Sequence, residues 1–67
     1  MNAWIGIPEN FVEVDKQLFD EYLASIQYER VLYNDCEWYH LVRGNYTIPI
    51  GIQKQMQCFL SRTVLTD

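Results

Sequence analysis

The sequence predicts one small α+β domain over residues 1–67, with an antiparallel meander of three or more strands packed on one amphipathic helix. Three observations support this fold class: a helical apolar pattern in residues 15–27, β-rich segments on both sides of a Gly-Asn pair, and no repeat or linker. A chain of 67 residues buries only about 60% of the surface that its unfolded form exposes. We therefore expect a thin core that relies on the ten aromatic side chains.

The helix is predicted over Asp15–Gln27. At 100° per residue, its apolar side chains fall within an arc of about 140°, and they are Leu18, Phe19, Tyr22, Leu23 and Ile26. Asp15 precedes the pattern and is a favoured N-cap residue. Beyond Gln27 the pattern fails because Glu29 would turn onto the apolar face. We expect the helix to end there.

Extended segments are expected on both sides of the helix. Ahead of it, residues 3–7 could form a short strand, Pro8 to Asn10 a turn, and Phe11 to Val14 an extended lead-in. After the helix, β-rich residues 29–33, a turn at Asn34 and Asp35, and a strand over residues 36–43 follow.

Gly44 and Asn45 predict a two-residue hairpin turn, with the chain returning over residues 46–52. This turn fixes the register, placing Arg43 opposite Tyr46 and Tyr39 opposite Ile50. The core side of the hairpin would carry Tyr39, Leu41, Ile48, Ile50 and Ile52, and the other side Trp38, His40, Val42, Thr47 and Pro49. Because Pro49 lacks an N–H, we expect a sheet edge at that point.

The C-terminal segment fits two structures. Residues 53–65 place Met56, Phe59 and Leu60 on one helical face, whereas the Thr-Val-Leu end favours a strand. We expect a second helix, with a strand as the alternative.

Charge and composition limit the partners. The net charge is −4, and residues 9–37 carry −6 whereas residues 38–66 carry +3. An acidic chain repels nucleic acid and anionic membranes, so neither is an expected partner. The sequence has neither a signal-peptide pattern nor an apolar run of about 18 residues, so we expect a soluble cytoplasmic protein. Cys36 and Cys58 would then be free thiols.

The sequence gives little support for a catalytic site or a metal site. His40 is the only histidine, and Cys36, four residues earlier on the same strand, would lie about 13 Å away. Cys36, His40 and Cys58 lack the close pairs typical of zinc ligation. The sequence has no nucleophile elbow, phosphate loop or dinucleotide fingerprint. We expect no metal or cofactor and no enzyme activity.

The function expected from these features is protein binding without catalysis, as in the small regulators or inhibitors that phages and other mobile elements encode. Trp38 on the outer hairpin side is the predicted main anchor, and the other predicted partner-binding residues are His40, Tyr46, Asp20 and Glu21. Should the C-terminal segment fold over Trp38, this residue would instead be core. Three alternatives remain: a homo-oligomeric structural subunit, including a homodimer; an acidic nucleic-acid mimic; and a minor enzyme or ligand binder using the Trp38 and His40 face.

Overall fold

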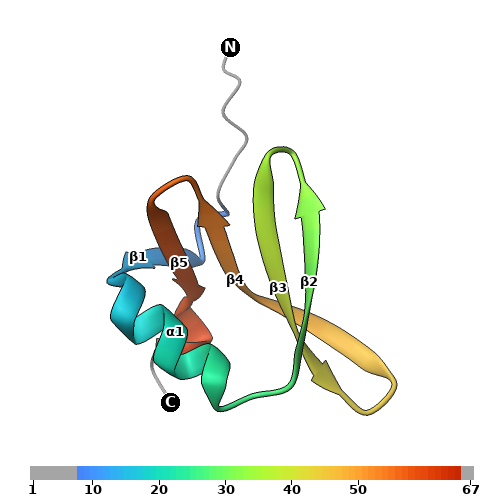
Figure 1. Cartoon of the computed structure of the whole chain (residues 1–67). Helices are drawn as coiled ribbons and strands as arrows, with labels where there is room; N and C mark the ends of the chain where they lie inside the picture. Colours follow the sequence, from blue (N-terminus) through green and yellow to red (C-terminus); the bar gives the residue numbers. More distant parts are fainter. Residues whose placement is uncertain (1–7, 66–67) are drawn as a thin grey trace.

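The chain forms a five-stranded antiparallel sheet with two short helices, and the strand order is β1-β5-β4-β3-β2 (Figure 1). The computed structural model describes residues 8–65, so the strand predicted at residues 3–7 lies outside the described part of the chain. The elements are β1 (Phe11–Val14), α1 (Lys16–Ala24), β2 (Tyr28–Tyr33), β3 (Cys36–Arg43), β4 (Tyr46–Lys54), β5 (Gln57–Ser61) and α2 (Arg62–Leu65). The sheet is thus larger than the predicted minimum of three strands.

Helix α1 is shorter than predicted, because it ends at Ala24. Asp15 occupies the N-cap position with extended backbone angles, but its side chain makes no capping hydrogen bond. Phe19 and Leu23 are buried, whereas Leu18 is exposed, contrary to its predicted place on the apolar face. Among residues 8–65, no helix is long and apolar enough to cross a membrane.

The β3–β4 hairpin follows the predicted register only as far as Pro49. Gly44 has φ +63°, and Arg43 pairs with Tyr46 as expected. Next to Pro49 the register shifts by one residue, so Tyr39 lies opposite Gly51 instead of Ile50. A bulge is one of the few ways in which a strand accommodates a residue without an N–H. The predicted edge at Pro49 is confirmed, because β5 pairs only with residues 51–54 of β4.

The expectation of a C-terminal helix is wrong for residues 57–61, which form β5 between β4 and β1. Gln55, with φ +54°, lies in the turn that leads from β4 into β5. Leu60 belongs to the core cluster on one side of the sheet, and alternation along the strand directs Phe59 to the other side. Apolar residues on both sides of a short strand gave a spacing that resembles a helix. Of the C-terminal segment 53–65, only Arg62–Leu65 is helical.

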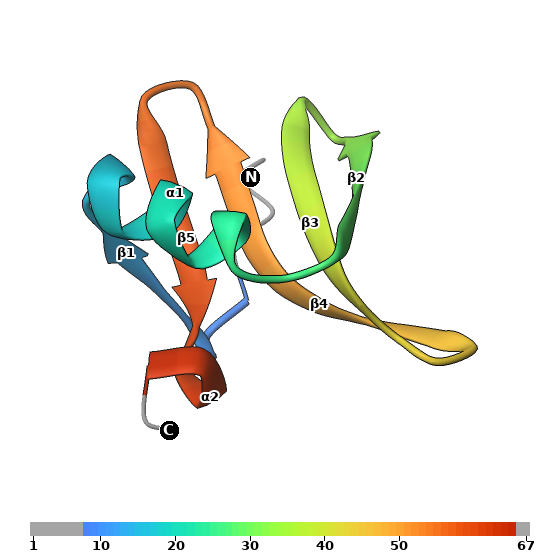
Figure 2. The same cartoon turned by 60° about the horizontal axis from the view of Figure 1, so that its bottom comes forward.

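The two sides of the sheet differ. Helix α1 lies across one of them (Figure 2), which we call the helix side. We call the opposite one the open side, because neither helix of residues 8–65 packs on it, although Ile52 and Cys36 are buried there. The helix-side core consists of Phe19, Leu23, Tyr39, Ile50, Cys58 and Leu60, with Val64 of α2 packed against it. A Cβ on Gly51 would lie 3.1 Å from Phe19 Cε1, so this glycine permits the close approach of α1. Because of the bulge, Ile52 is buried outside this cluster, not on the predicted core side.

Candidate protein-binding surface

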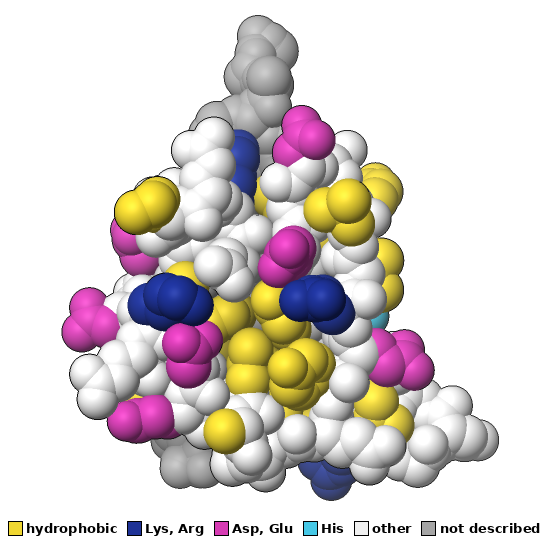
Figure 3. Space-filling model, viewed as in Figure 1, with side chains coloured by type: hydrophobic (Ala, Val, Ile, Leu, Met, Phe, Trp, Pro, Cys, Tyr) yellow, Lys and Arg dark blue, Asp and Glu magenta, His cyan; other side chains and the backbone are white. Residues whose placement is uncertain are grey.

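A row of apolar side chains crosses three strands on the helix side, beyond the end of α1. Tyr28 of β2 pairs with Leu41 of β3, which pairs with Ile48 of β4. Tyr28 is 40% exposed and Ile48 is 39% exposed, while Leu41 is half-buried. Tyr22 and Ile26, also half-buried, pack on the core cluster together with Leu41. We call these five residues the helix-side patch. Figure 3, drawn from this side, shows hydrophobic side chains gathered at the centre of the molecule.

The patch is exposed because α1 is too small to cover the sheet. A helix of nine residues is about 14 Å long and 10 to 12 Å wide, whereas five strands span about 19 Å. The buried side chains of α1, Phe19 and Leu23, cover the part of the sheet near Gly51 and Leu60. The outer part, on β2 and β3, therefore keeps apolar groups in contact with solvent.

Charged side chains flank the patch on the strands. Arg30 lies two residues after Tyr28 on β2, and Arg43 lies two residues after Leu41 on β3, so both are on the helix side. Both arginines are exposed. The two arginines therefore border the apolar row on its opposite sides, Arg30 toward Tyr39 and Arg43 toward the hairpin turn, although the whole chain is acidic.

Trp38 and His40 lie on the open side. The Trp38 ring is half-buried between Phe11 and Tyr33, with centroid distances of 6.4 and 6.3 Å and edge-to-face geometry. Its Nε1 is buried and has no hydrogen-bond partner within residues 8–65. His40, also half-buried, lies between Glu29 and Pro49 in the sheet register.

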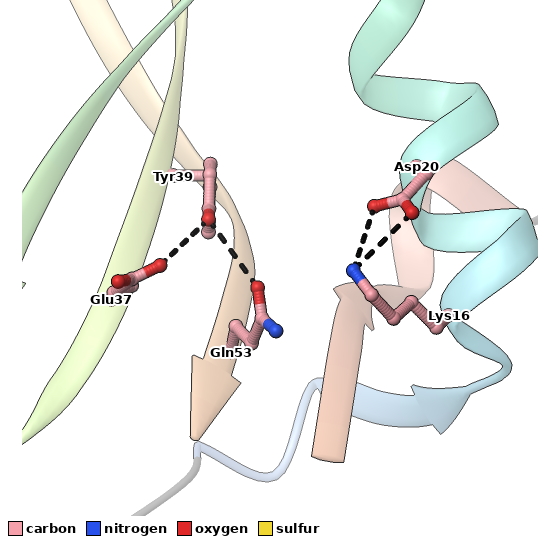
Figure 4. A network of polar contacts seen from close by, with 5 residues as sticks. All are labelled: Lys16, Asp20, Glu37, Tyr39 and Gln53. Carbon is pink, nitrogen blue, oxygen red and sulfur yellow. Dashed lines mark hydrogen bonds and ion pairs between the residues drawn. The ribbon is translucent and has the colours of Figure 1, made fainter. Parts of the chain in front are cut away.

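The five predicted partner-binding residues do not form one surface. Asp20 and Glu21 lie exposed on α1, across the sheet from Trp38. Asp20 forms a 3.3 Å ion pair with Lys16 (Figure 4). Tyr46 is exposed at the hairpin end of β4, about 20 Å along the strand from the residue that faces Trp38. Only Trp38 and His40 are brought together.

A polar network around Tyr39 was not predicted from the sequence. Its hydroxyl donates a 2.9 Å hydrogen bond to Glu37 Oε1 and lies 3.4 Å from Gln53 Oε1 (Figure 4). Burial raises the pKa of Tyr39, and the bond to the Glu37 carboxylate adds to this effect, while Arg30 opposes it. The phenol is therefore held protonated. The register that places Glu37 opposite Gln53 depends on the bulge, which no local pattern in the sequence indicated.

A shallow pocket of about 260 Å³ adjoins this network, and it is lined by Leu32, Asp35, Glu37, Gln53 and Gln55. Two carboxylates and two amides give it many hydrogen-bond acceptors. Within residues 8–65, no group of three or more histidine, cysteine, aspartate or glutamate side chains is arranged to hold a metal ion. The pocket geometry thus supports polar contacts.

The two cysteines are free and buried on opposite sides of the sheet. Cys58 belongs to the helix-side core, and burial raises the pKa of its thiol. Cys36 lies two residues before Trp38 on β3, which places it on the open side. The sheet therefore separates Cys58 from Cys36 and His40, and these three residues do not converge.

Comparison with known proteins finds no matching family model, no matching curated protein and no matching solved structure.

Proposed function

We propose that the protein is a binding module without catalytic activity, which acts in the cytoplasm by occupying a partner protein's surface, as small regulators and inhibitors do. The observation that carries the proposal is the row of Tyr28, Leu41 and Ile48, which stays exposed beyond the end of α1. Apolar patches that remain exposed on a small protein commonly mark interaction sites.

Tyr28 has the properties of an anchor. Its ring packs edge-to-face on Tyr39 at a centroid distance of 5.4 Å, and Tyr39 in turn packs on Phe19 at 5.3 Å. A ring that is already fixed by the core loses little conformational entropy when a partner covers it. Tyrosine and arginine are also among the residue types that most often dominate binding energy.

The charges around the patch indicate the chemistry of the partner. Because Arg30 and Arg43 border the apolar row, an apolar segment flanked by carboxylates would complement it. In this proposal α1 is an amphipathic helix whose inner face packs on the sheet. Its outer face carries Asp20 and Glu21, which would attract basic groups at the edge of the partner.

The test compares variants in binding to the partner isolated from the native host. Tyr28→Ala should weaken binding by about 2 kcal/mol, roughly 30-fold, while circular dichroism shows an intact fold. Met56→Ala is the matched control, because Met56 is 91% exposed in the distant β4–β5 turn, and it should bind normally.

Trp38 with His40 is the second candidate, favoured by the exposed Tyr33 ring that packs edge-to-face on the Trp38 ring. Trp38→Ala separates the two surfaces. If a folded Trp38→Ala variant loses binding while Tyr28→Ala keeps it, the open side is the interface and the helix-side patch is not.

A further inference from the structure

Strand β2 is an end strand whose outer backbone edge pairs with no other strand of residues 8–65. All six of its residues are exposed, including Val31 and Leu32, which are 43% and 75% exposed. Edge strands are usually protected by a proline, a bulge or charged side chains, lysine above all. β2 has no proline, bulge or lysine in its unbroken pairing to β3, and its two charged residues, Glu29 and Arg30, are of opposite sign. The other end strand, β1, has only four residues.

We propose that β2 pairs antiparallel with β2 of a second copy, so that two five-stranded sheets join into one sheet with two-fold symmetry. Directly opposite residues must point to the same side of the joined sheet, and side chains alternate along each strand. The two-fold axis must therefore lie between the two copies of one β2 residue, which then pairs with itself. An axis through Glu29 or Arg30 would set like charges directly opposite each other, which is unfavourable. An axis through Val31 pairs Val31 with itself, Arg30 with Leu32, and Glu29 with Tyr33.

Charge favours a second copy at this edge. The chain carries −4, so most surfaces of two copies repel each other. Glu29 and Arg30 make β2 neutral, and the Val31 register places exposed apolar groups at the contact. A strand of six residues offers less area than the roughly 800 Å² per partner of a standard interface, which makes the dimer weak and dependent on concentration.

This inference does not rest on the proposed function, since the dimer would form through the backbone edge of β2, whereas the helix-side patch lies on a face of the sheet.

Light scattering and sedimentation of the full chain provide the first test. The mass should rise from 8.0 kDa toward twice that value as concentration increases. Val31→Lys, at an exposed position, should keep the fold by circular dichroism and hold the mass at 8.0 kDa. A mass of 8.0 kDa at every concentration, or a dimer that Val31→Lys leaves intact, overturns the proposal.

Disulfide cross-linking tests the register. Cβ atoms of directly opposite residues lie about 5 Å apart, close to disulfide geometry, whereas diagonal neighbours lie at about 7 to 8 Å. Under mild oxidation Val31→Cys should therefore form covalent dimers several-fold faster than Arg30→Cys or Leu32→Cys, because its thiols lie closer to disulfide geometry. The unsubstituted chain, with Cys36 and Cys58 buried, is the control. Equal rates, or faster cross-linking of either neighbour, contradict the Val31-centred pairing.

Discussion

Strands β5 and β2 belong to one sheet, yet they differ in the number of neighbouring strands and in the burial of their side chains. β5 has a strand on each side and α1 over it, and its Cys58 and Leu60 are at most 2% exposed. Within residues 8–65, β2 pairs with one strand, and none of its side chains is buried. The contrast teaches that the side chains buried on the helix side gather under α1. We call β1, β5 and the adjoining parts of β4 and β3 the covered half of the sheet, and β2, whose side chains are all exposed, the exposed half.

The largest expected effect is at the centre of the covered half. Phe19 has no exposed surface, packs edge-to-face on Tyr39 and lies over Gly51, where an added Cβ would be 3.1 Å from its ring. Phe19→Ala should cost about 3 to 5 kcal/mol, enough to unfold most of a small domain. Urea denaturation followed by circular dichroism measures this loss. Leu18→Ala, one residue away but exposed, is the control and should cost less than about 1 kcal/mol; equal losses would refute the placement of α1.

A smaller effect is expected where α1 approaches β4. The methyl group of Gly51→Ala would lie 3.1 Å from Phe19 Cε1, so the ring must shift, at a cost of about 1 to 3 kcal/mol. Phe19→Leu should relieve part of this cost, because the aromatic atoms in the close contact are removed. A double-mutant cycle in urea measures the coupling, and strictly additive losses would mean that the two groups do not touch.

The hydroxyl of Tyr39 links β3 to Gln53 of β4, and we expect the loss of this group to have a smaller effect again. Tyr39→Phe removes the hydrogen bond to Glu37 and should cost about 1 kcal/mol at neutral pH. Because the pKa of Tyr39 is raised by folding, its contribution is complete below the pKa of an unfolded tyrosine, about 10, and is lost as the pH rises through the folded value. Unfolding measured from pH 9 to 12 should show a steeper alkaline loss for the native chain than for Tyr39→Phe. Parallel curves would contradict the burial of the phenol.

The smallest effect is expected on β2. Leu32 is 75% exposed, so Leu32→Ser should change the free energy of unfolding by no more than about 0.5 kcal/mol. Thermal melts at low protein concentration measure this change. A loss comparable to that of Gly51→Ala would show that β2 contributes to the core.

Local sequence chemistry predicted the turns at residues 34–35 and 44–45 and the β2–β3–β4 meander, but not the turn between β4 and β5. Asn34, Asp35 and Gly44 all have positive φ, as the turn patterns require. The bulge beside Pro49 and the pairing of β1 with β5 were not predicted, because they join segments whose partner choice depends on the whole sheet. The exposure of Ile48 also depends on the arrangement of the whole fold. Ile48 was expected in the core, but it is exposed because α1 does not extend over the hairpin.

The candidate site was harder to predict than the fold. Tyr28, on the helix-side patch, was not singled out, since its exposure follows from where α1 ends and not from any motif. Trp38 was correctly placed on the side of β3 away from the helix-side core. Its role as an anchor stays a prediction.

Amide hydrogen exchange at residue resolution tests the contrast between the two halves most directly. At low protein concentration, the amides of β5 from Cys58 to Leu60 should exchange only through global unfolding, whereas those of β2 should exchange through local opening and be far less protected. Equal protection of β2 and β5 in dilute solution would contradict the separation of the sheet into a stabilising half and a free edge.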